Sequence, residues 1–515
     1  MTYRIGVDVG GTNTDAVLLN DNLEVVESVK VHTTYDIETG IYEAIKKIVD
    51  MSSIDKNEIK YAMLGTTYCT NAIVERKRLN KVGVIRIAKP ATTAIPPFSD
   101  WPNDLKKEVE FYSEIISGGY EFDGRILEEI SKKEVLEFCK KVNGKVGAIA
   151  ITGVFSTINK DQEIKVSEWI KEELGDIPIS LSSEIGNIGI LERENATILN
   201  SALKEAGKII VKGFNEALNK LDLKCEIYFS QNDGTLMDGE YTEKYPIFTI
   251  GCGVTNSIRG ASYLSGVKNG IVLDVGGTTT DIGVLKDGFP RESSIAVNIG
   301  GVHTNFRMPD MISIGVAGGT IVSKEEDKIT VGPESVGYKI TEESIIFGGN
   351  ILTLTDVSAK LNNIFPDKEE MISKLDYNYC EKIQQLVMDK IENSIDQMKT
   401  NRIDVPVILT GGGSIIVSDE INGASEVIKP AFYDSANAVG AALGMISGEV
   451  ESIYKLDDIS RKDAIENAKQ NAINKAKDLG AKEDTINIIN IEDIPLTYLP
   501  GNATLVKAKA VGKFI

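Results

Sequence analysis

Two short segments, far apart in the chain, repeat nearly the same pattern of aspartate, glycine and threonine. Each follows an apolar run and leads into another, so each predicts a β-hairpin with a tight Gly-Gly turn. Glycine pairs let backbone N–H groups approach an anion closely, and successive N–H groups form a concave anion site. Two such hairpins favour a paired phosphate clamp over two ordinary turns. The segments are Asp8-Val9-Gly10-Gly11-Thr12-Asn13-Thr14-Asp15 and Asp274-Val275-Gly276-Gly277-Thr278-Thr279-Thr280-Asp281.

The acidic and polar side chains of these hairpins suit a phosphate group that carries a metal ion. Asp8 and Asp274, at the ends of the first strands, could hold a hydrated Mg²⁺, which is usually bound by one or two carboxylates, several waters and phosphate oxygens. Asp15 and Asp281 could assist the metal or brace their own turns, and the sequence leaves both interpretations open. The residues between the aspartates are expected to cradle the phosphates: Gly10, Gly11, Thr12, Asn13, Thr14, Gly276, Gly277, Thr278, Thr279 and Thr280.

Small polar residues and glycines also follow other predicted strands, where the ligands of open α/β sheets usually lie. After the strand at 61–65, Thr66, Thr67 and Asn71 could line a substrate site or could cap a helix, and the pattern favours neither. After the strand at 406–410, three glycines would let a flat adenine or ribose lie against bare backbone. These glycines are Gly411, Gly412 and Gly413. Two further predicted strands are followed by polar residues, which lie at 182–184 and at 231–235.

Composition and charge exclude several classes of function. The 515-residue chain carries a net charge of −20, which leaves no basic face for nucleic acid or an anionic membrane, so we expect neither as a partner. Its two histidines and five scattered cysteines argue against a Ser-His-Asp hydrolase, a zinc site and a disulfide framework. Without a secretory pattern or an apolar run long enough to span a bilayer, we expect a cytoplasmic protein.

The succession of strand and helix patterns predicts an α/β protein of two lobes with a small additional unit. We expect an N-terminal lobe over 1–190, a C-terminal lobe over 191–448 and an appended α+β module over 449–515, where the composition becomes rich in lysine and glutamate. Four prolines and a Gly-Gly pair between 81 and 125 predict an excursion with little regular structure. The small residues of 434–442 predict a helix suited to close packing where the lobes hinge.

Two phosphate hairpins, a glycine turn for adenosine and a small-residue helix occur here in an order that resembles the actin-like ATPase superfamily. In detail, the chain is similar to the hydantoinase A/oxoprolinase family over roughly residues 3–445. The resemblance implies an α/β fold of two actin-like ATPase (ribonuclease H-like) lobes around a nucleotide cleft. The matching segments, besides the two hairpins, are 65–67 with 70–72 and 75–76, 182–184 followed by 192–193, 231–234 and 318–320.

The resemblance also implies an activity that uses ATP and Mg²⁺. The γ-phosphoryl group would move to the oxygen of a cyclic amide or related carbonyl compound, which is then hydrolysed or carboxylated, with a hydrolytic partner subunit. Asp8, Asp274, Asp15 and Asp281 are the expected catalytic carboxylates, the first two on the metal side. Gly411 to Gly413 would face adenosine, while Thr66, Thr67 and Asn71 would line the acceptor side. A homo-oligomer is also compatible with the sequence.

Two other functions stay open at the level of sequence. A small-molecule hydroxyl kinase would need a catalytic aspartate near an alcohol and would accumulate phosphorylated product without a partner. A non-catalytic nucleotide switch of the actin or chaperone kind would turn ATP over slowly and would not respond to small amides.

Overall fold

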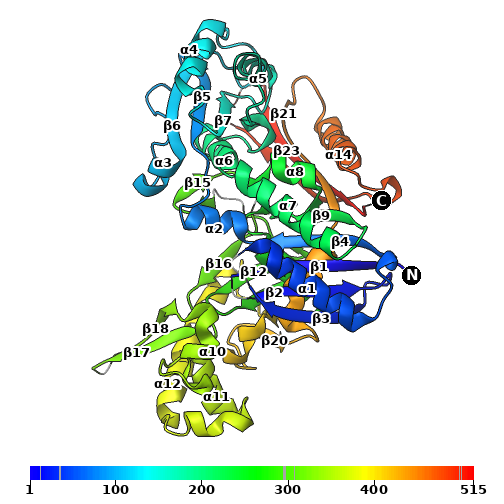
Figure 1. The fold of residues 1–515 in the computed structure, drawn as a ribbon. Helices are drawn as coiled ribbons and strands as arrows, with labels where there is room; N and C mark the ends of the chain where they lie inside the picture. The colour runs from blue at the N-terminus through cyan, green and yellow to red at the C-terminus, as the bar shows by residue number, and fades with distance from the viewer. Residues whose placement is uncertain are drawn as a thin grey trace.

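A computed structural model describes residues 1–11, 13–33, 36–293, 297–306, 308–326, 328–497, 499 and 501–514. The expected phosphate residue Thr12 lies outside these described residues. Figure 1 shows a four-stranded sheet with α4 and α5 at one end of the molecule and the region of α11 and α12 at the other, with the two largest sheets between them.

The largest sheet has nine strands and contains the first phosphate hairpin. Its strand order is β22-β23-β21-β10-β9-β4-β1-β2-β3. β1 pairs with β2 antiparallel and with β4 parallel, and β4 pairs with β9 parallel. Alternating apolar residues such as Ile5 and Val7 are fully buried against helices α1 and α7. The bounds are β1 Tyr3–Val9, β2 Asn13–Leu19, β3 Val25–His32, β4 Ile59–Thr66, β9 Glu226–Ser230, β10 Leu236–Met237, β21 Ile446–Lys455, β22 Asn487–Pro495, β23 Ala503–Gly512, α1 Ile37–Ser52, α2 Tyr68–Val74, α7 Lys204–Lys220 and α8 Gly239–Lys244.

The second sheet contains the second phosphate hairpin. Its order is β13-β12-β11-β19-β20, and β16 also pairs with β12. Helices α11 and α12 supply much of its apolar core, and the β17–β18 hairpin projects from this end of the molecule (Figure 1). The bounds are β11 Gly270–Val275, β12 Thr280–Lys286, β13 Phe289–Pro290, β14 Val297–Ile299, β15 Val302–Thr304, β16 Met311–Ile314, β17 Thr320–Glu325, β18 Lys328–Ser335, β19 Val405–Thr410, β20 Ala424–Ile428, α10 Ile340–Glu343, α11 Leu354–Asn362 and α12 Tyr377–Met398.

A third sheet of four parallel strands, in the order β6-β5-β7-β8, forms a separate unit. It occupies part of the segment expected to be irregular, because the prolines between 81 and 125 fall in the connections and not inside β5 or β6. The bounds are β5 Val82–Lys89, β6 Glu110–Ser117, β7 Ala148–Gly153, β8 Ile179–Leu181, α3 Asn103–Val109, α4 Lys132–Val142, α5 Asp161–Leu174 and α6 Ile190–Ala202.

The sheets divide the chain differently from the expected lobe boundaries. β9 and β10 follow residue 191, yet they pair within the first sheet, and the strands after 449 extend that same sheet. Helix α14 (Arg461–Asp478) buries an alanine stripe, Ala464, Ala468, Ala472 and Ala476, against β21 and β23. The lysine- and glutamate-rich composition marks the solvent side of this helix. It does not reveal that the neighbouring strands continue a larger sheet.

Helices α9 (Cys252–Ser265) and α13 (Ala436–Ala442) form a tightly packed pair between the two large sheets. A Cβ atom at Gly440 would lie 1.8 Å from the Asn256 carbonyl oxygen, and one at Gly260 would lie 1.8 Å from that of Ala436. Only glycine permits such an approach of two backbones. The predicted small-residue helix is therefore present, and it joins the two halves of the molecule.

Candidate active site

The two phosphate hairpins have the same internal geometry. In the first, Asp8 pairs with Asp15 across β1 and β2, and in the second Asp274 pairs with Asp281 across β11 and β12. Each turn is closed by one backbone hydrogen bond. The Gly10 N–H donates to the carbonyl oxygen of the residue three positions later at 3.0 Å, and the Gly276 N–H donates to the carbonyl oxygen three positions later in its own turn at 2.9 Å. The repeat in the sequence is thus a repeat in structure.

Both hairpins line one cavity of about 1310 Å³. The cavity also reaches the glycine turn after β19 and the start of α2. The expected site residues that line it are Asp8, Gly10, Gly11, Asn13, Asp15, Thr67, Asn71, Asp274, Gly276, Gly277, Thr278, Thr279, Asp281, Gly411, Gly412 and Gly413.

Three expected site residues do not line this cavity. Thr14, Thr66 and Thr280 are buried in the protein. The Thr280 hydroxyl donates to the Val316 carbonyl oxygen, and Thr66 Oγ1 accepts a hydrogen bond of 3.2 Å from the Tyr68 N–H. Successive residues of a strand point to opposite faces, so a run of threonines cannot place every hydroxyl in the cleft.

Asp8 is a buried carboxylate with unmet hydrogen-bonding capacity. Asn437 Nδ2 donates to its Oδ2 at 2.9 Å, while its Oδ1 accepts no hydrogen bond from the described residues. Burial, together with the neighbouring Asp15 and Asp274, raises the pKa of Asp8 to about 7. A buried carboxylate oxygen without a partner is suited to a cation or its hydration water.

Asp15 has a cation of its own. Lys30 Nζ lies 3.0 Å from Asp15 Oδ1 and donates to the Asp434 carbonyl oxygen, also at 3.0 Å. Burial raises the pKa of Asp15, and the ammonium of Lys30 opposes that rise. This pairing favours the bracing interpretation of Asp15, because its charge is already balanced within the first sheet.

The second pair of carboxylates is also buried. Ser257 Oγ donates to Asp274 Oδ2 at 2.5 Å, and burial raises the pKa of Asp274. Burial, with Asp274 nearby, raises the pKa of Asp281 to about 6, against a hydrogen bond from Ser313. Among the described residues, no group of three or more His, Cys, Asp or Glu side chains forms a ready-made metal site.

The glycine turn after β19 packs directly against the second hairpin. A Cβ atom at Gly411, whose φ is +80°, would lie 2.3 Å from the Val275 carbonyl oxygen, and one at Gly413 would lie 2.2 Å from that of Gly276. A side chain at either position would push the turn away from the hairpin. Tyr338, with 65% of its surface exposed, lies at the rim of the same cavity.

At the other end, the cavity is lined by α2 and by the β14–β15 hairpin. Thr67 is the residue that precedes α2, but its side chain makes no capping hydrogen bond with the helix. Arg76 holds the β14–β15 hairpin in place, because its guanidinium donates to the Gly300 carbonyl oxygen at 2.9 Å and forms an ion pair with Asp104 at 3.0 Å. This end combines the polar Thr67 and Asn71 with several apolar side chains, among them Val74, Val297, Ile299 and Met308.

Three residues that position the carboxylates were not singled out from the sequence: Lys30, Ser257 and Asn437. Each reaches its aspartate from a different element. The short polar run before the helix at 436–442 was the one available signal for Asn437.

No helix among the described residues combines the length and apolar character needed to cross a membrane.

Comparison with known families agrees with this geometry. The model of the hydantoinase/oxoprolinase N-terminal region matches residues 4–174, and that of hydantoinase/oxoprolinase matches residues 193–398. The chain belongs to the hydantoinase/oxoprolinase family. The resemblance inferred from the two hairpins and their accompanying motifs is therefore confirmed.

Three curated relatives of this hydantoinase/oxoprolinase chain are about equally distant. An uncharacterized protein of Methanocaldococcus jannaschii is 25% identical over 77% of this chain and 62% of its own length. Caprolactamase subunit alpha of Pseudomonas jessenii is 24% identical over 70% of this chain and 54% of its own length. Acetophenone carboxylase gamma subunit of Aromatoleum aromaticum is 24% identical over 70% of this chain and 53% of its own length. The matches thus span between 53% and 62% of these relatives.

The fold is shared with a solved relative. The crystal structure of ATP-dependent caprolactamase from Pseudomonas jessenii superposes with a TM-score of 0.79 at 18% identity, covering 99% of this chain and 88% of that one. The predicted α/β class is confirmed.

Proposed function

We propose that this chain is an ATP-dependent enzyme subunit that phosphorylates, and so activates, the carbonyl oxygen of a cyclic amide or related carbonyl compound. The observation that carries the proposal is the convergence of two nearly identical phosphate-type hairpins and a glycine turn on one cavity of about 1310 Å³. The names of the caprolactamase and carboxylase relatives support a carbonyl substrate and leave both hydrolysis and carboxylation as the following step.

Each part of the cleft has a defined task in this proposal. The Gly-Gly turns provide backbone N–H groups for the triphosphate, and the turn at 411–413 leaves room for the nucleoside. Asp8 and Asp274 would hold Mg²⁺, mainly through water, and Asn437 and Ser257 orient their carboxylates. When bound, Mg²⁺ neutralises charge on the phosphates. Phosphoryl transfer depends mostly on such positioning and charge neutralisation.

The acceptor end suits a carbonyl compound with a hydrocarbon body. Apolar side chains of α2 and the β14–β15 hairpin would pack on the hydrocarbon, while Thr67 and Asn71 could donate hydrogen bonds to the carbonyl oxygen. With an amide substrate, the carbonyl oxygen attacks the γ-phosphorus as the bond from that phosphorus to ADP breaks, and the amide nitrogen then releases its proton to water to give a phosphorylated imidate. Because the attacking oxygen carries no proton, no general base is needed to activate it.

An isotope experiment tests the proposed transfer directly. The purified chain is assayed for Mg²⁺-dependent ATP hydrolysis against lactams, hydantoins and ketones, with and without a candidate partner subunit. With a stimulating lactam or hydantoin whose carbonyl oxygen is ¹⁸O and whose C–N bond is hydrolysed, the proposal predicts ¹⁸O in the released phosphate, because the phosphate leaves with that oxygen when water attacks the carbon. Unlabelled phosphate from such a hydrolysed substrate would exclude transfer to the carbonyl oxygen. Stimulation by alcohols alone would favour a hydroxyl kinase, and turnover insensitive to every compound would favour a nucleotide switch.

The proposal includes a partner subunit for the second step. The caprolactamase and acetophenone carboxylase relatives are themselves named as subunits. In that step water or a carboxylating species attacks the activated carbon. A partner that completes the reaction should raise product formation without changing the affinity of this chain for Mg-ATP.

A further inference from the structure

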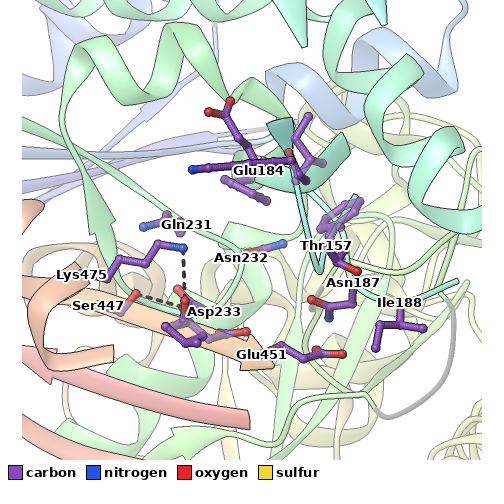
Figure 2. A pocket seen from close by; sticks show the side chains of 18 of the residues that line it. Thr157, Glu184, Asn187, Ile188, Gln231, Asn232, Asp233, Ser447, Glu451 and Lys475 are labelled. Atoms are coloured by element: carbon purple, nitrogen blue, oxygen red, sulfur yellow. Dashed lines mark hydrogen bonds between the residues drawn. The ribbon is translucent and has the colours of Figure 1, made fainter. Parts of the chain in front are cut away.

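A second cavity lies apart from the phosphate cleft, between the four-stranded sheet, the nine-stranded sheet and helix α14 (Figure 2). Its volume is about 450 Å³, within the usual range for small-molecule sites. Among the described residues it shares no lining residue with the cleft. It contains the two polar sequence segments that the cleft leaves unused, the residues that follow β8 and β9. Both segments lie beyond the carboxyl ends of strands that have parallel neighbours, where ligands commonly bind.

One wall of this cavity is apolar and aromatic. Tyr241, Phe248 and Phe306 line it, and the rings of Tyr241 and Phe248 stack with centroids 6.3 Å apart and planes 20° apart. The ring of Phe306 meets that of Phe248 edge-on at 6.2 Å. Such a wall offers contact area for a hydrocarbon chain.

Most charged groups of the cavity are balanced by protein partners. Asp233 Oδ2 lies 2.8 Å from the ammonium of the buried Lys509, and Glu184 accepts a hydrogen bond of 2.7 Å from the Tyr245 hydroxyl. Lys244 also lies 3.3 Å from Glu184. These carboxylates shape the cavity, but their charges are already compensated.

Glu451 is held less closely. Its side chain is 10% exposed and forms an ion pair with Lys507, whose Nζ lies 3.5 Å from Oε2, but this buried Oε2 accepts no hydrogen bond from the described residues. The buried Thr157 Oγ1, also at the cavity wall, has no hydrogen-bond partner there either. Buried polar atoms without partners are costly and uncommon in folded proteins. Together with the enclosing cavity, they indicate that a polar ligand completes this site.

A cationic side chain reaches the same cavity from another element. Lys475, on α14, lines the cavity and donates to the Glu449 carbonyl oxygen at 3.1 Å. Figure 2 shows Lys475 and Glu451 approaching the cavity from separate elements. One carboxylate and one ammonium beside an apolar wall are complementary to a molecule with an ammonium, a carboxylate and a hydrocarbon spacer.

We propose that this cavity binds a small ω-amino acid, with its ammonium on Glu451, its carboxylate on Lys475 and its hydrocarbon chain along Phe248 and Phe306. Hydrolysis of a lactam yields such a molecule: the C–N bond breaks, and water supplies OH to the acyl carbon and a proton to the nitrogen. The link between this site and the reaction therefore rests on the proposed function. Binding to the cavity does not depend on it.

Titration calorimetry of the full chain, without nucleotide, tests the assignment with 6-aminohexanoate as the probe. We expect one site per chain. Hexanoate, which lacks the ammonium, and hexylamine, which lacks the carboxylate, should each bind about tenfold more weakly or worse, because each loses one charge-assisted contact. Saturating Mg-ATP should not displace the probe, because the two cavities are separate.

Two variants and a matched control localise the binding. Glu451→Gln and Lys475→Met should each weaken 6-aminohexanoate about tenfold, whereas Lys462→Met, at an exposed position of the same helix, should leave it unchanged. Circular dichroism confirms that each variant is folded. The assignment is overturned if the wild type does not bind, if Mg-ATP competes, or if both variants bind like the wild type. Intact binding alongside a failed isotope experiment would overturn only the proposed function.

Discussion

At the residue scale, the chemistry of the cleft depends on carboxylates that are buried before any ligand arrives. Asp8 accepts a hydrogen bond from the neutral side chain of Asn437, and Asp274 from that of Ser257; these contacts orient the carboxylate oxygens without cancelling their charge. Asp15, by contrast, is paired with Lys30 at 3.0 Å. The same residue type thus occurs in two environments: Asp8 keeps one buried oxygen without a hydrogen bond from the described residues, whereas Asp15 is paired with a lysine. Sequence alone shows the repeated aspartates but not this division, because Lys30, Ser257 and Asn437 come from separate elements.

The raised pKa of Asp8 predicts an unusual pH dependence of stability. Its pKa is about 7 in the folded chain and ordinarily 3.8, so the folded state binds more protons between these values and loses stability as pH rises through about 7. Without Mg²⁺, Asp8→Asn should remove this loss and be more stable than the wild type at pH 8. Urea unfolding from pH 5 to 8 measures it, with the exposed Asp50→Asn as control. Parallel profiles for the wild type and Asp8→Asn would contradict the assignment.

At the element scale, local patterns predicted local structure well and distant pairing poorly. Both hairpins and the glycine turn at 411–413 were predicted, because their signals lie within a few consecutive residues. The nine-stranded sheet was not, since its connection to β21, β22 and β23 depends on the pairing of β21 with β10, which lies about two hundred residues earlier in the chain. The prolines at residue 90 and between residues 96 and 102 suggested irregular structure. Nevertheless, β5 ends just before them and β6 begins after them. Proline restricts the positions it occupies and says little about strands that avoid it.

A buried ion pair joins β5 to α6 and predicts a large effect of one substitution. Arg86 and Glu194 are at most 1% exposed, and Arg86 Nε donates to Glu194 Oε1 at 2.8 Å. Glu194→Ala leaves an uncompensated buried guanidinium and should lower the free energy of unfolding by about 3–5 kcal/mol. Glu172→Ala, which breaks the exposed pair with Lys132, should cost less than about 1 kcal/mol.

Denaturant unfolding measures the free energy of unfolding of these two variants and of one double variant. The double variant Arg86→Met/Glu194→Leu removes both charges and should recover much of the loss seen in Glu194→Ala. If Glu194→Ala were no more destabilising than Glu172→Ala, the pair would not be an important link between sheet and helix.

At the scale of the whole molecule, α9 and α13 form the contact on which the shape of the cleft depends. α13 carries Asn437 to Asp8 in the first sheet, and α9 carries Ser257 to Asp274 in the second. The two helices meet at Gly260 and Gly440 with their backbones in contact. The spacing between the two hairpins is therefore set by these glycines. The sequence indicated a closely packed helix at 434–442, but not which helix it meets.

Gly440→Ala should disturb both stability and the cleft. Its Cβ would lie 1.8 Å from the Asn256 carbonyl oxygen, so the helices must separate, at a cost of about 3 kcal/mol or more. The affinity of this variant for Mg-ATP should fall together with its stability. Gly213→Ala in α7 is the control, because its Cβ would meet Ile37 Cγ2 at an ordinary 3.4 Å. That change should be neutral or stabilise the helix by up to about 1 kcal/mol. Thermal unfolding compares the two, and equal effects would contradict the role of the helix contact.

If two hairpins from different sheets hold one Mg-ATP between them, calorimetric titration of Mg-ATP into the wild type, Asp8→Ala and Asp274→Ala should show it. We expect one nucleotide per chain and a loss of affinity of about 10–100-fold in each variant, as for carboxylates that act through water on the metal. Two nucleotides per chain, or unchanged affinity in either variant, would contradict it.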